Sequence, residues 1–315
     1  MNLDYILFAQ HGWADDERAM TALAHHLITP DVPLIAPCLD YFQTWMRMEP
    51  LIQQVEAIAL QTFASYPQTP ARIIGHSMGG LIWLEVLTRH PDWWSQVHSL
   101  VLIACPVGGA DLGRIIDPLQ LGVGIAADLG KDRKSLAAAI ATVIPTLVIA
   151  GDIDQGSDGT VTVTCTQFPY AAFVCLPGLS HPTLRNHPAV VAVIRDFWED
   201  FSIAERIAYN DMIEQLRQVP GMTDGHWRDF ERSQLRFTDR NGITLRVWRN
   251  PLGVSHVFVA SPTGLCIYAG FVGWLHDANL AAAIETMRQN DSQNDSQNDS
   301  QNDSQHGSPT PSSHS

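Results

Sequence analysis

The sequence is poor in cationic side chains. Its 315 residues include 19 Lys and Arg against 33 Asp and Glu, which gives a formal net charge of −14 at pH 7. Four of these charges come from the aspartates of a C-terminal tail without Lys or Arg, so the rest of the chain carries −10. Because an acidic protein repels phosphate groups, we expect no nucleic-acid partner.

Long apolar runs are also absent. No uninterrupted apolar run reaches the roughly 18 residues that a membrane-spanning helix needs. Residues 1–5 show neither the basic nor the apolar region of a signal peptide. We therefore expect no stable membrane insertion and a cytoplasmic location. The five cysteines are scattered, mostly within apolar runs, so they are expected to be reduced and structural.

Motifs for metals and dinucleotides are missing as well. The sequence contains no H-E-x-x-H, no C-x-x-C and no G-x-G-x-x-G pattern. These spacings bring metal ligands together or set backbone N–H groups against a pyrophosphate. We therefore expect neither a metal site nor a cofactor.

Six short apolar runs alternate with longer segments of helical spacing in the first two thirds of the chain. The runs are 5–9, 32–36, 72–74, 100–104, 146–150 and 171–176, and the helical segments include 17–27, 51–63, 80–89 and 188–201. Near-continuous apolar runs are typical of parallel strands covered by helices on both faces. The pattern predicts an α/β fold over residues 1–201, with a doubly wound, mostly parallel sheet of about six strands. A Gly-rich and then apolar insert at 107–143 predicts a small helical cap.

The organisation changes after residue 201. Ser202 is a candidate N-cap of a helix that runs to about Gln218. Alternating segments at 234–238, 243–249, 257–260 and 265–271 predict antiparallel hairpins, closed by a helix at about 277–287. Residues 202–288 are therefore expected to form a small α+β unit of unknown role. Residues 289–304 are four copies of Gln-Asn-Asp-Ser, and we expect 289–315 to be a disordered tail.

The pentapeptide G-H-S-M-G at 75–79 lies between an apolar run and a helical segment. A sharp strand-to-helix turn at such a place lifts a serine hydroxyl clear of the sheet, and glycine neighbours let strand and helix pack closely. The helix N-terminus supplies unpaired N–H groups and a positive dipole end. Ser77 is therefore the predicted nucleophile.

Two backbone N–H groups are predicted to stabilise an oxyanion beside Ser77. Met78 would donate one from the helix N-terminus. Trp13 would donate the other, because Q-H-G-W at 10–13 follows the first apolar run and Gly12 allows a close approach. His11, taken alone, is typical of a turn residue.

An orienting acid and a base should follow the serine, in that order. His181 is the predicted base, since it lies between the last strand and the final helix, whereas His187 is typical of the start of that helix. Asp154 and Asp158 both follow the run 146–150 and compete as the acid. Asp152 is a third candidate, more typical of a turn.

Four motifs together resemble those of the α/β-hydrolase superfamily, in particular its lipase and esterase branch. They are Q-H-G-W at 10–13, G-H-S-M-G-G at 75–80, S-D-G-T-V at 157–161 and G-L-S-H at 178–181. The resemblance covers about residues 1–201. It implies an acid after the penultimate core strand: Asp154 fits a Gly-x-x-Asp spacing, and Asp158 fits a Ser-Asp-Gly-x-Val form, which we favour. Relatives usually have two further strands before the oxyanion loop, so the resemblance also implies a shortened sheet.

The resemblance implies a serine hydrolase that cleaves a carboxylic ester, of a lipid, an acyl group or a thioester, through an acyl-enzyme on Ser77. The expected partner is a small acyl ester. Trp13, Met78 and the apolar residues within 112–121 could line its pocket or belong to the core. Two alternatives stay open: an acyltransferase with the same three side chains, and a non-catalytic protein in which the fold serves 202–288 as a binding module.

Overall fold

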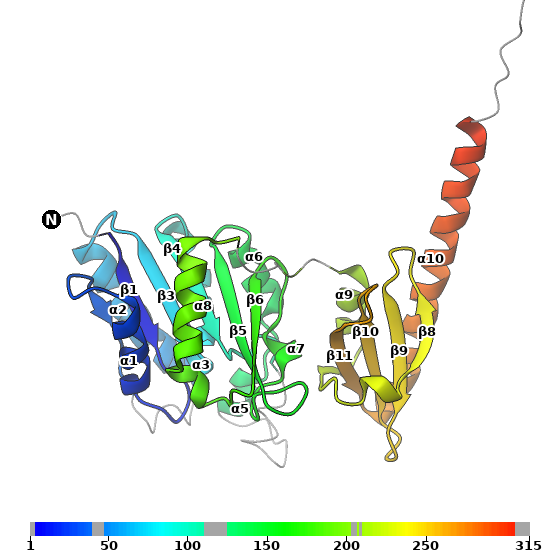
Figure 1. The fold of residues 1–315 in the computed structure, drawn as a ribbon, viewed down its shortest axis with the longest axis horizontal. Helices are drawn as coiled ribbons and strands as arrows, with labels where there is room; N and C mark the ends of the chain where they lie inside the picture. The colour runs from blue at the N-terminus through cyan, green and yellow to red at the C-terminus, as the bar shows by residue number, and fades with distance from the viewer. Residues whose placement is uncertain (1–3, 40–46, 110–124, 203–206, 208–209, 306–315) are drawn as a thin grey trace, which may run out of the picture. The chain divides into compact units, whose positions relative to one another are not determined.

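The computed structural model describes residues 4–39, 47–109, 125–202, 207 and 210–305 (Figure 1), of which 126–127 and 292–305 by their backbone alone. Internal contacts divide the chain into two compact units. The N-terminal unit comprises residues 1–209 and 224–228, and the C-terminal unit comprises 210–223 and 229–315. The domain boundaries expected after residues 201 and 288 stay a prediction, because compactness alone does not show which segments fold independently.

A six-stranded parallel sheet forms the centre of the N-terminal unit, in the order β2-β1-β3-β4-β5-β6. The strands are β1 Ile6–Gln10, β2 Leu34–Ile35, β3 Ala71–His76, β4 Val97–Ile103, β5 Thr146–Asp152 and β6 Ala172–Pro177. Each strand overlaps one of the apolar runs of the sequence. The predicted α/β fold with a sheet of about six strands is confirmed.

Helices cover both faces of this sheet (Figure 1). They are α1 Glu17–Leu27, α2 Met48–Ser65, α3 Met78–Arg89, α5 Ile125–Leu129, α6 Lys134–Ala141, α7 Val163–Thr166 and α8 Pro188–Glu199, with short 3-10 turns η2 Pro91–Trp93 and η3 Thr183–Arg185. Successive strand residues point to opposite faces. Phe8 and Ile73 therefore join the core packed by α2 and α3, whereas Leu7 and Ile74 join the core packed by α1 and α8.

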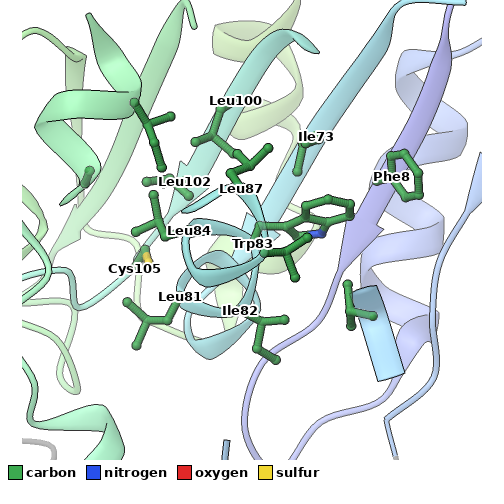
Figure 2. Packing of buried hydrophobic residues seen from close by; sticks show 14 of the residues in the cluster. Phe8, Ile73, Leu81, Ile82, Trp83, Leu84, Leu87, Leu100, Leu102 and Cys105 are labelled. Carbon is green, nitrogen blue, oxygen red and sulfur yellow. The ribbon is translucent and has the colours of Figure 1, made fainter. Parts of the chain in front are cut away.

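Helix α3 is buried along most of its length, with residues 78–84, 86 and 87 all in the core. The indole of Trp83 lies edge-on to Phe8 of β1, with ring centroids 4.8 Å apart (Figure 2). Leu87 points to the region of Leu100 on β4 (Figure 2). A helix that is apolar on all sides is expected between a sheet and other helices. Packing on several sides thus fixes the start of α3.

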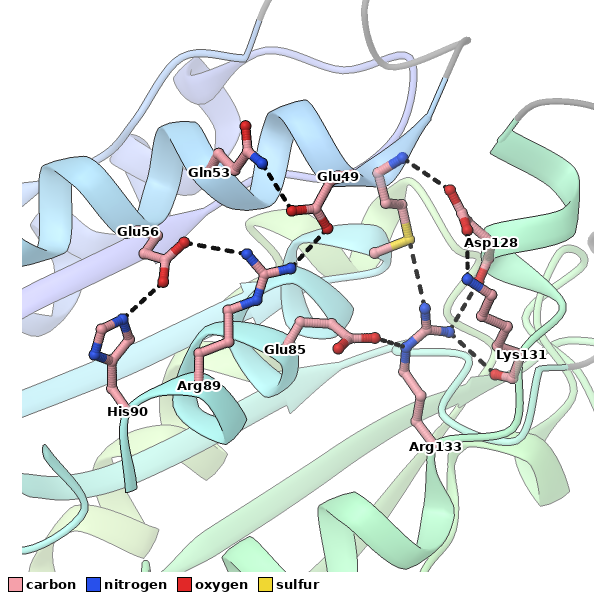
Figure 3. A network of polar contacts seen from close by, with 10 residues as sticks. Glu49, Gln53, Glu56, Glu85, Arg89, His90, Asp128, Lys131 and Arg133 are labelled. Carbon is pink, nitrogen blue, oxygen red and sulfur yellow. Dashed lines mark hydrogen bonds and ion pairs between the residues drawn. The ribbon is translucent and has the colours of Figure 1, made fainter. Parts of the chain in front are cut away.

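A network of charged side chains joins α3 to α2 and to the insert that follows β4 (Figure 3). Arg89, at the end of α3, contacts Glu49 at 2.6 Å and Glu56 at 3.1 Å, both on α2. Arg133, just before α6, contacts Glu85 of α3 at 2.7 Å, and its side chain is only 5% exposed. A buried guanidinium is costly without partners, and Arg133 Nη1 also donates to the carbonyl oxygens of Asp128 and Lys131, so the insert is tied to α3 through a fully bonded arginine.

The insert expected as a helical cap at 107–143 contains α5 and α6 in its second part. Its start is joined to the residue before α6 by a hydrogen bond from the backbone N–H of Arg133 to Val107 O, at 2.8 Å. The apolar residues within 112–121 lie outside the described residues. Their assignment to a substrate pocket stays a prediction.

The C-terminal unit contains a five-stranded sheet in the order β7-β11-β10-β9-β8, antiparallel from β11 to β8. Its strands are β7 Met222–Asp224, β8 Gln234–Thr238, β9 Thr244–Arg249, β10 Ser255–Ala260 and β11 Cys266–Val272. Leu245, Val257 and Tyr268 pack from the sheet against Leu216 and Leu280 of its helices. The four expected hairpin strands are present, and β7 is an additional one.

The helices of this unit differ from expectation at their ends. The described helix α9 is Asp211–Arg217, shorter than the expected 202–218, because Asn210 Oδ1 accepts a hydrogen bond from Ile213 N at 3.1 Å and so caps it. Ser202 instead hydrogen bonds Asp200 after α8, and residues 203–206 and 208–209 lie outside the described residues. Helix α10, Asp277–Gln305, continues past residue 287 through the four repeats. That the tail is disordered in solution stays a prediction. Among the described residues, no helix is long and apolar enough to cross a membrane.

Candidate active site

Ser77 lies in the one-residue turn between β3, which ends at His76, and α3, which begins at Met78. Its backbone has φ 53° and ψ −125°, a conformation that a residue with a side chain rarely adopts. The turn is held because Ser77 N donates to Ile103 O of β4 at 2.8 Å. Strain of this kind persists only where the surrounding packing enforces it.

Two glycines make the turn possible through close approach rather than through their own φ angles. A Cβ on Gly75 would lie 2.5 Å from Gly80 Cα, and one on Gly79 would lie 2.5 Å from the carbonyl oxygens of Gln10 and His11. Any side chain at these positions would push α3 away from β3 or from the loop after β1. The expected tight strand-to-helix packing around Ser77 is therefore present.

Three side chains from separate loops form a continuous hydrogen-bonded chain. His181 Nδ1 lies 2.7 Å from Asp158 Oδ2, and His181 Nε2 lies 3.1 Å from Ser77 Oγ. Because a carboxylate only accepts, the proton sits on Nδ1, and Nε2 can accept from the serine hydroxyl. The carboxylate is 2% exposed, and its Oδ1 accepts from the backbone N–H groups of Thr160 and Val161.

Asp154 has a different set of contacts. Its Oδ1 accepts from the backbone N–H and the hydroxyl of Ser157, both at 2.9 Å, and so closes the turn that leads to Asp158. Asp152 likewise accepts from the backbone of Gly156, at 2.8 Å. Of the three aspartates weighed from the sequence, Asp158 is the one that is hydrogen bonded to His181.

The loop after β1 approaches Ser77 closely. A Cβ on Gly12 would lie 2.9 Å from Ser77 Cβ and 3.4 Å from Met78 N, so the backbone that leads into Trp13 lies directly beside the serine. The N–H of Met78 is in the first turn of α3, where helix geometry leaves it without an intrahelical acceptor. The two residues predicted as oxyanion donors, Trp13 and Met78, thus both line the cavity at Ser77, and their role as donors stays a prediction.

His11 has a buried side chain, although the sequence pattern indicated a turn residue. Its Nε2 accepts from Leu39 N at 3.0 Å, so its proton must be on Nδ1, which donates to Gly12 O at 3.0 Å. Burial lowers the pKa of His11 and favours this neutral form. The imidazole thereby fixes the backbone next to Trp13.

His76 contacts His181, the candidate general base. Its Nε2 donates to the backbone oxygen of His181 at 3.2 Å, and the two rings are 4.7 Å apart. Burial, and then the neighbouring His181, hold the pKa of His76 well below its usual value. The neutral ring supports the loop that carries His181 without adding a charge beside it.

A cavity of about 250 Å³ opens at Ser77. Its lining includes Trp13, His76, Met78, Thr160 and His181. An ion pair at its wall, Arg185 Nη1 to Asp15 Oδ1 at 2.5 Å, joins the loop after β1 to the loop after β6. The two loops that carry Trp13 and His181 are therefore linked directly.

Reasoning from the sequence did not find His76 or the Asp15–Arg185 pair. His76 could have been noticed as the polar residue inside the G-H-S-M-G motif. The ion pair has no local signal, since its partners are 170 residues apart. Both contacts depend on the parallel sheet, which brings the ends of β1, β3 and β6 to one edge.

Among the described residues, no group of three or more His, Cys, Asp or Glu side chains is arranged to hold a metal ion. The five cysteines are free thiols, with Cys105 and Cys165 buried. Burial raises the pKa of the Cys165 thiol to about 12, so it stays protonated and unreactive.

No protein-family model and no curated protein matches the sequence. Among solved structures, the propeptide form of the lipase BlEst2 from Bacillus licheniformis is similar, with 13% identity and a TM-score of 0.51 over 86% of this chain and 71% of that one. Its mature form gives 15% identity and a TM-score of 0.48 over 64% and 93%. Est1E from Butyrivibrio proteoclasticus, with bound ferulic acid, gives 14% and 0.49 over 64% and 90%. The chain has an α/β-hydrolase fold. At these identities the similarity concerns the fold, and chemistry has to be argued from the site itself.

Proposed function

We propose that this protein is a serine hydrolase that cleaves the carboxylic ester of a small acyl substrate. The observation that carries the proposal is the hydrogen-bonded chain from Asp158 through His181 to Ser77, with distances of 2.7 and 3.1 Å. A nucleophile bonded to a base, which is in turn oriented by a buried acid, is the arrangement that activates a serine hydroxyl. The α/β-hydrolase fold and the cavity at Ser77 are consistent with it.

In the first half of the proposed reaction, Ser77 Oγ attacks the ester carbonyl carbon while its proton moves to His181 Nε2. The carbonyl oxygen becomes negative and accepts hydrogen bonds from the N–H groups of Met78 and Trp13. His181 then gives its proton to the departing alkoxide, or thiolate in a thioester. The acyl group is left on Ser77.

In the second half, His181 takes a proton from water, and the hydroxide attacks the acyl carbon. Collapse of this intermediate releases the carboxylic acid and returns the proton to Ser77 Oγ. Asp158 stays ionised and stabilises the imidazolium in both halves. The free thiols of the chain support the cytoplasmic location that we propose with this activity.

A fluorophosphonate probe tests the proposal, because it reacts only with an activated serine. The folded wild-type protein should become labelled, and Ser77→Ala should not. Ester cleavage should then be found with p-nitrophenyl esters of graded chain length, and the length with the highest kcat/KM gives the acyl class. Labelling that survives in Ser77→Ala, or a folded wild type that is never labelled, would overturn the proposal.

A further inference from the structure

The β8–β9 hairpin of the C-terminal unit concentrates positive charge in an acidic chain. Residues 234–249 contain four arginines and one aspartate, so this segment carries a formal charge of +3 while the whole chain carries −14. A fifth arginine, Arg232, directly precedes β8. A local reversal of charge of this size attracts anions to one part of the surface.

Three of these arginines border a groove of about 570 Å³ between the hairpin and α10, within the C-terminal unit. Arg232, Arg236 and Arg249 line it together with Trp248. The opposite wall belongs to α10, which contributes the apolar Leu280, Ala281 and Ile284 together with Asp277 and Glu285 near its rim. We call this feature the arginine groove.

Most charged side chains around the arginine groove form ion pairs with one another or with neighbouring residues. The exception is an arginine, Arg236. Glu285 is held by Arg288 at 2.6 Å, and Asp277 lies 3.5 Å from Arg249. Arg232 contacts Asp229 at 3.0 Å.

Arg236 also lines the groove, and it is exposed. Within the described residues it has no hydrogen-bond or ion-pair partner. The groove therefore offers one uncompensated guanidinium opposite the apolar side chains of α10.

We propose that the arginine groove binds a small amphipathic anion, with a carboxylate or phosphate head at Arg236 and Arg249 and an apolar body along Ala281 and Ile284 of α10. A guanidinium presents a planar set of donors that matches both head groups. The volume lies in the range of about 300–1,000 Å³ that is typical of small-molecule sites. The concave shape and the acidic residues at its rim favour a single soluble anion over a flat anionic surface. This site is independent of the proposed chemistry at Ser77.

Calorimetric titration of the full chain tests the arginine groove with four ligands of one chain length: decanoate, decyl phosphate, decanol and decylammonium. We expect one equivalent of an anion to bind, more weakly as salt is raised, and neither decanol nor decylammonium to bind comparably. Tighter binding of decanoate or of decyl phosphate identifies the head group, and either result supports the proposal.

The matched variants are Arg236→Gln, Arg236→Gln with Arg249→Gln, and Arg240→Gln. The first should weaken anion binding about threefold and the second at least tenfold. Arg240 is the control, because it lies in the same hairpin but does not line the groove, and its change should be below twofold. Circular dichroism melting checks the fold of each variant.

Three results would overturn the proposal. One is that neither anion binds. Another is that decanol binds as tightly as the anions, which would make the site merely apolar. The third is an unchanged affinity in the folded double variant, which would move the ligand elsewhere, for instance to the cavity at Ser77. Vesicles of anionic phospholipid that bind the protein when the soluble anions do not would likewise replace this proposal by docking at a membrane surface.

Discussion

The two units of the chain differ in where their backbone is strained. Among the described residues of the N-terminal unit, six other than glycine have positive φ, and two of them, Ser77 at 53° and Ala14 at 52°, line the cavity. In the described part of the C-terminal unit, every residue with positive φ is a glycine. Glycine adopts such angles without steric cost, whereas other residues need enforcement by their surroundings.

Buried polar side chains follow the same division. Around Ser77 the imidazoles of His11 and His76 are buried and form hydrogen bonds with the backbone of neighbouring loops. The arginines around the arginine groove are largely exposed, for example Arg249 with 61% of its side chain accessible. The surroundings of Ser77 thus hold side chains in a fixed geometry, whereas the arginine groove presents accessible charge. Substitutions around Ser77 should therefore affect turnover and stability, and substitutions in the arginine groove should affect neither strongly.

The largest effect should come from the acid of the hydrogen-bonded chain. Asp158→Asn keeps the shape but no longer enforces the Nδ1–H tautomer of His181, so ester turnover should fall by about 10⁴-fold in kcat. Asp154→Asn is the matched control, because Asp154 contacts Ser157 and not His181. Its turnover should stay within about threefold of wild type. Steady-state kinetics on folded proteins check both, and the reverse ranking would transfer the role to Asp154.

A second contrast concerns glycines that differ in their surroundings. Gly75→Ala should destabilise the N-terminal unit by at least about 3 kcal/mol, since the new Cβ meets backbone atoms of α3 that cannot move aside. Gly273→Ala in the C-terminal unit meets nothing within 4 Å, and its effect should stay within about 0.5 kcal/mol. Calorimetric melting curves measure both. Equal destabilisation by the two changes would contradict the assignment of tight packing to β3 and α3.

The third contrast is the response of stability to acid. The pKa values of His11 and His76 are lowered chiefly by burial. An unfolded histidine titrates near pH 6.5, so above that pH both states are neutral and the two residues add no dependence. Below it the unfolded state takes up protons first, and the free energy of unfolding falls by up to about 1.4 kcal/mol per pH unit for each histidine.

Urea unfolding between pH 7.5 and 5.5 checks this expectation. His76→Asn should flatten the acid-side slope, and His25→Asn, on the surface of α1, should not. A slope that is the same in all three proteins would show that His76 has the same pKa in the folded and unfolded states.

The longer strands and helices of the N-terminal unit could be predicted because each leaves an apolar run or a helical spacing in the sequence. Helix α1 was expected at 17–27 and is Glu17–Leu27, since Asp16 caps it and its apolar residues recur at helical spacing. Strand β7 has three residues, too few for an alternating pattern, and its place in the sheet depends on pairing with the distant β11. The start of α9 was missed because Asn210 rather than Ser202 supplies the N-cap.

At the site, the sequence named Ser77, Asp158 and His181, which the structure brings within hydrogen-bond distance of one another. Their motifs are local: a turn between strand and helix, and loops at strand ends. The choice between Asp154 and Asp158 needed coordinates, because both carboxylates follow β5 and only the folding of the intervening turn decides which one faces the imidazole. His76 and the Asp15–Arg185 pair needed the strand order as well.

The smallest effect should come from removing the repeats of α10. Their aspartates at 291, 295, 299 and 303 are four residues apart, so on a helix they repel one another along one side. The repeats contain no apolar residue that could compensate by packing. Deletion after Arg288 should therefore change the stability of the C-terminal unit by less than about 0.5 kcal/mol and ester turnover by less than twofold.

Comparing the helical circular dichroism signal of the full and shortened chains at pH 7 and below pH 4 tests the cause. Protonation should add helix to the full chain alone, and a tail that is fully helical at both pH values would show that repulsion does not govern it.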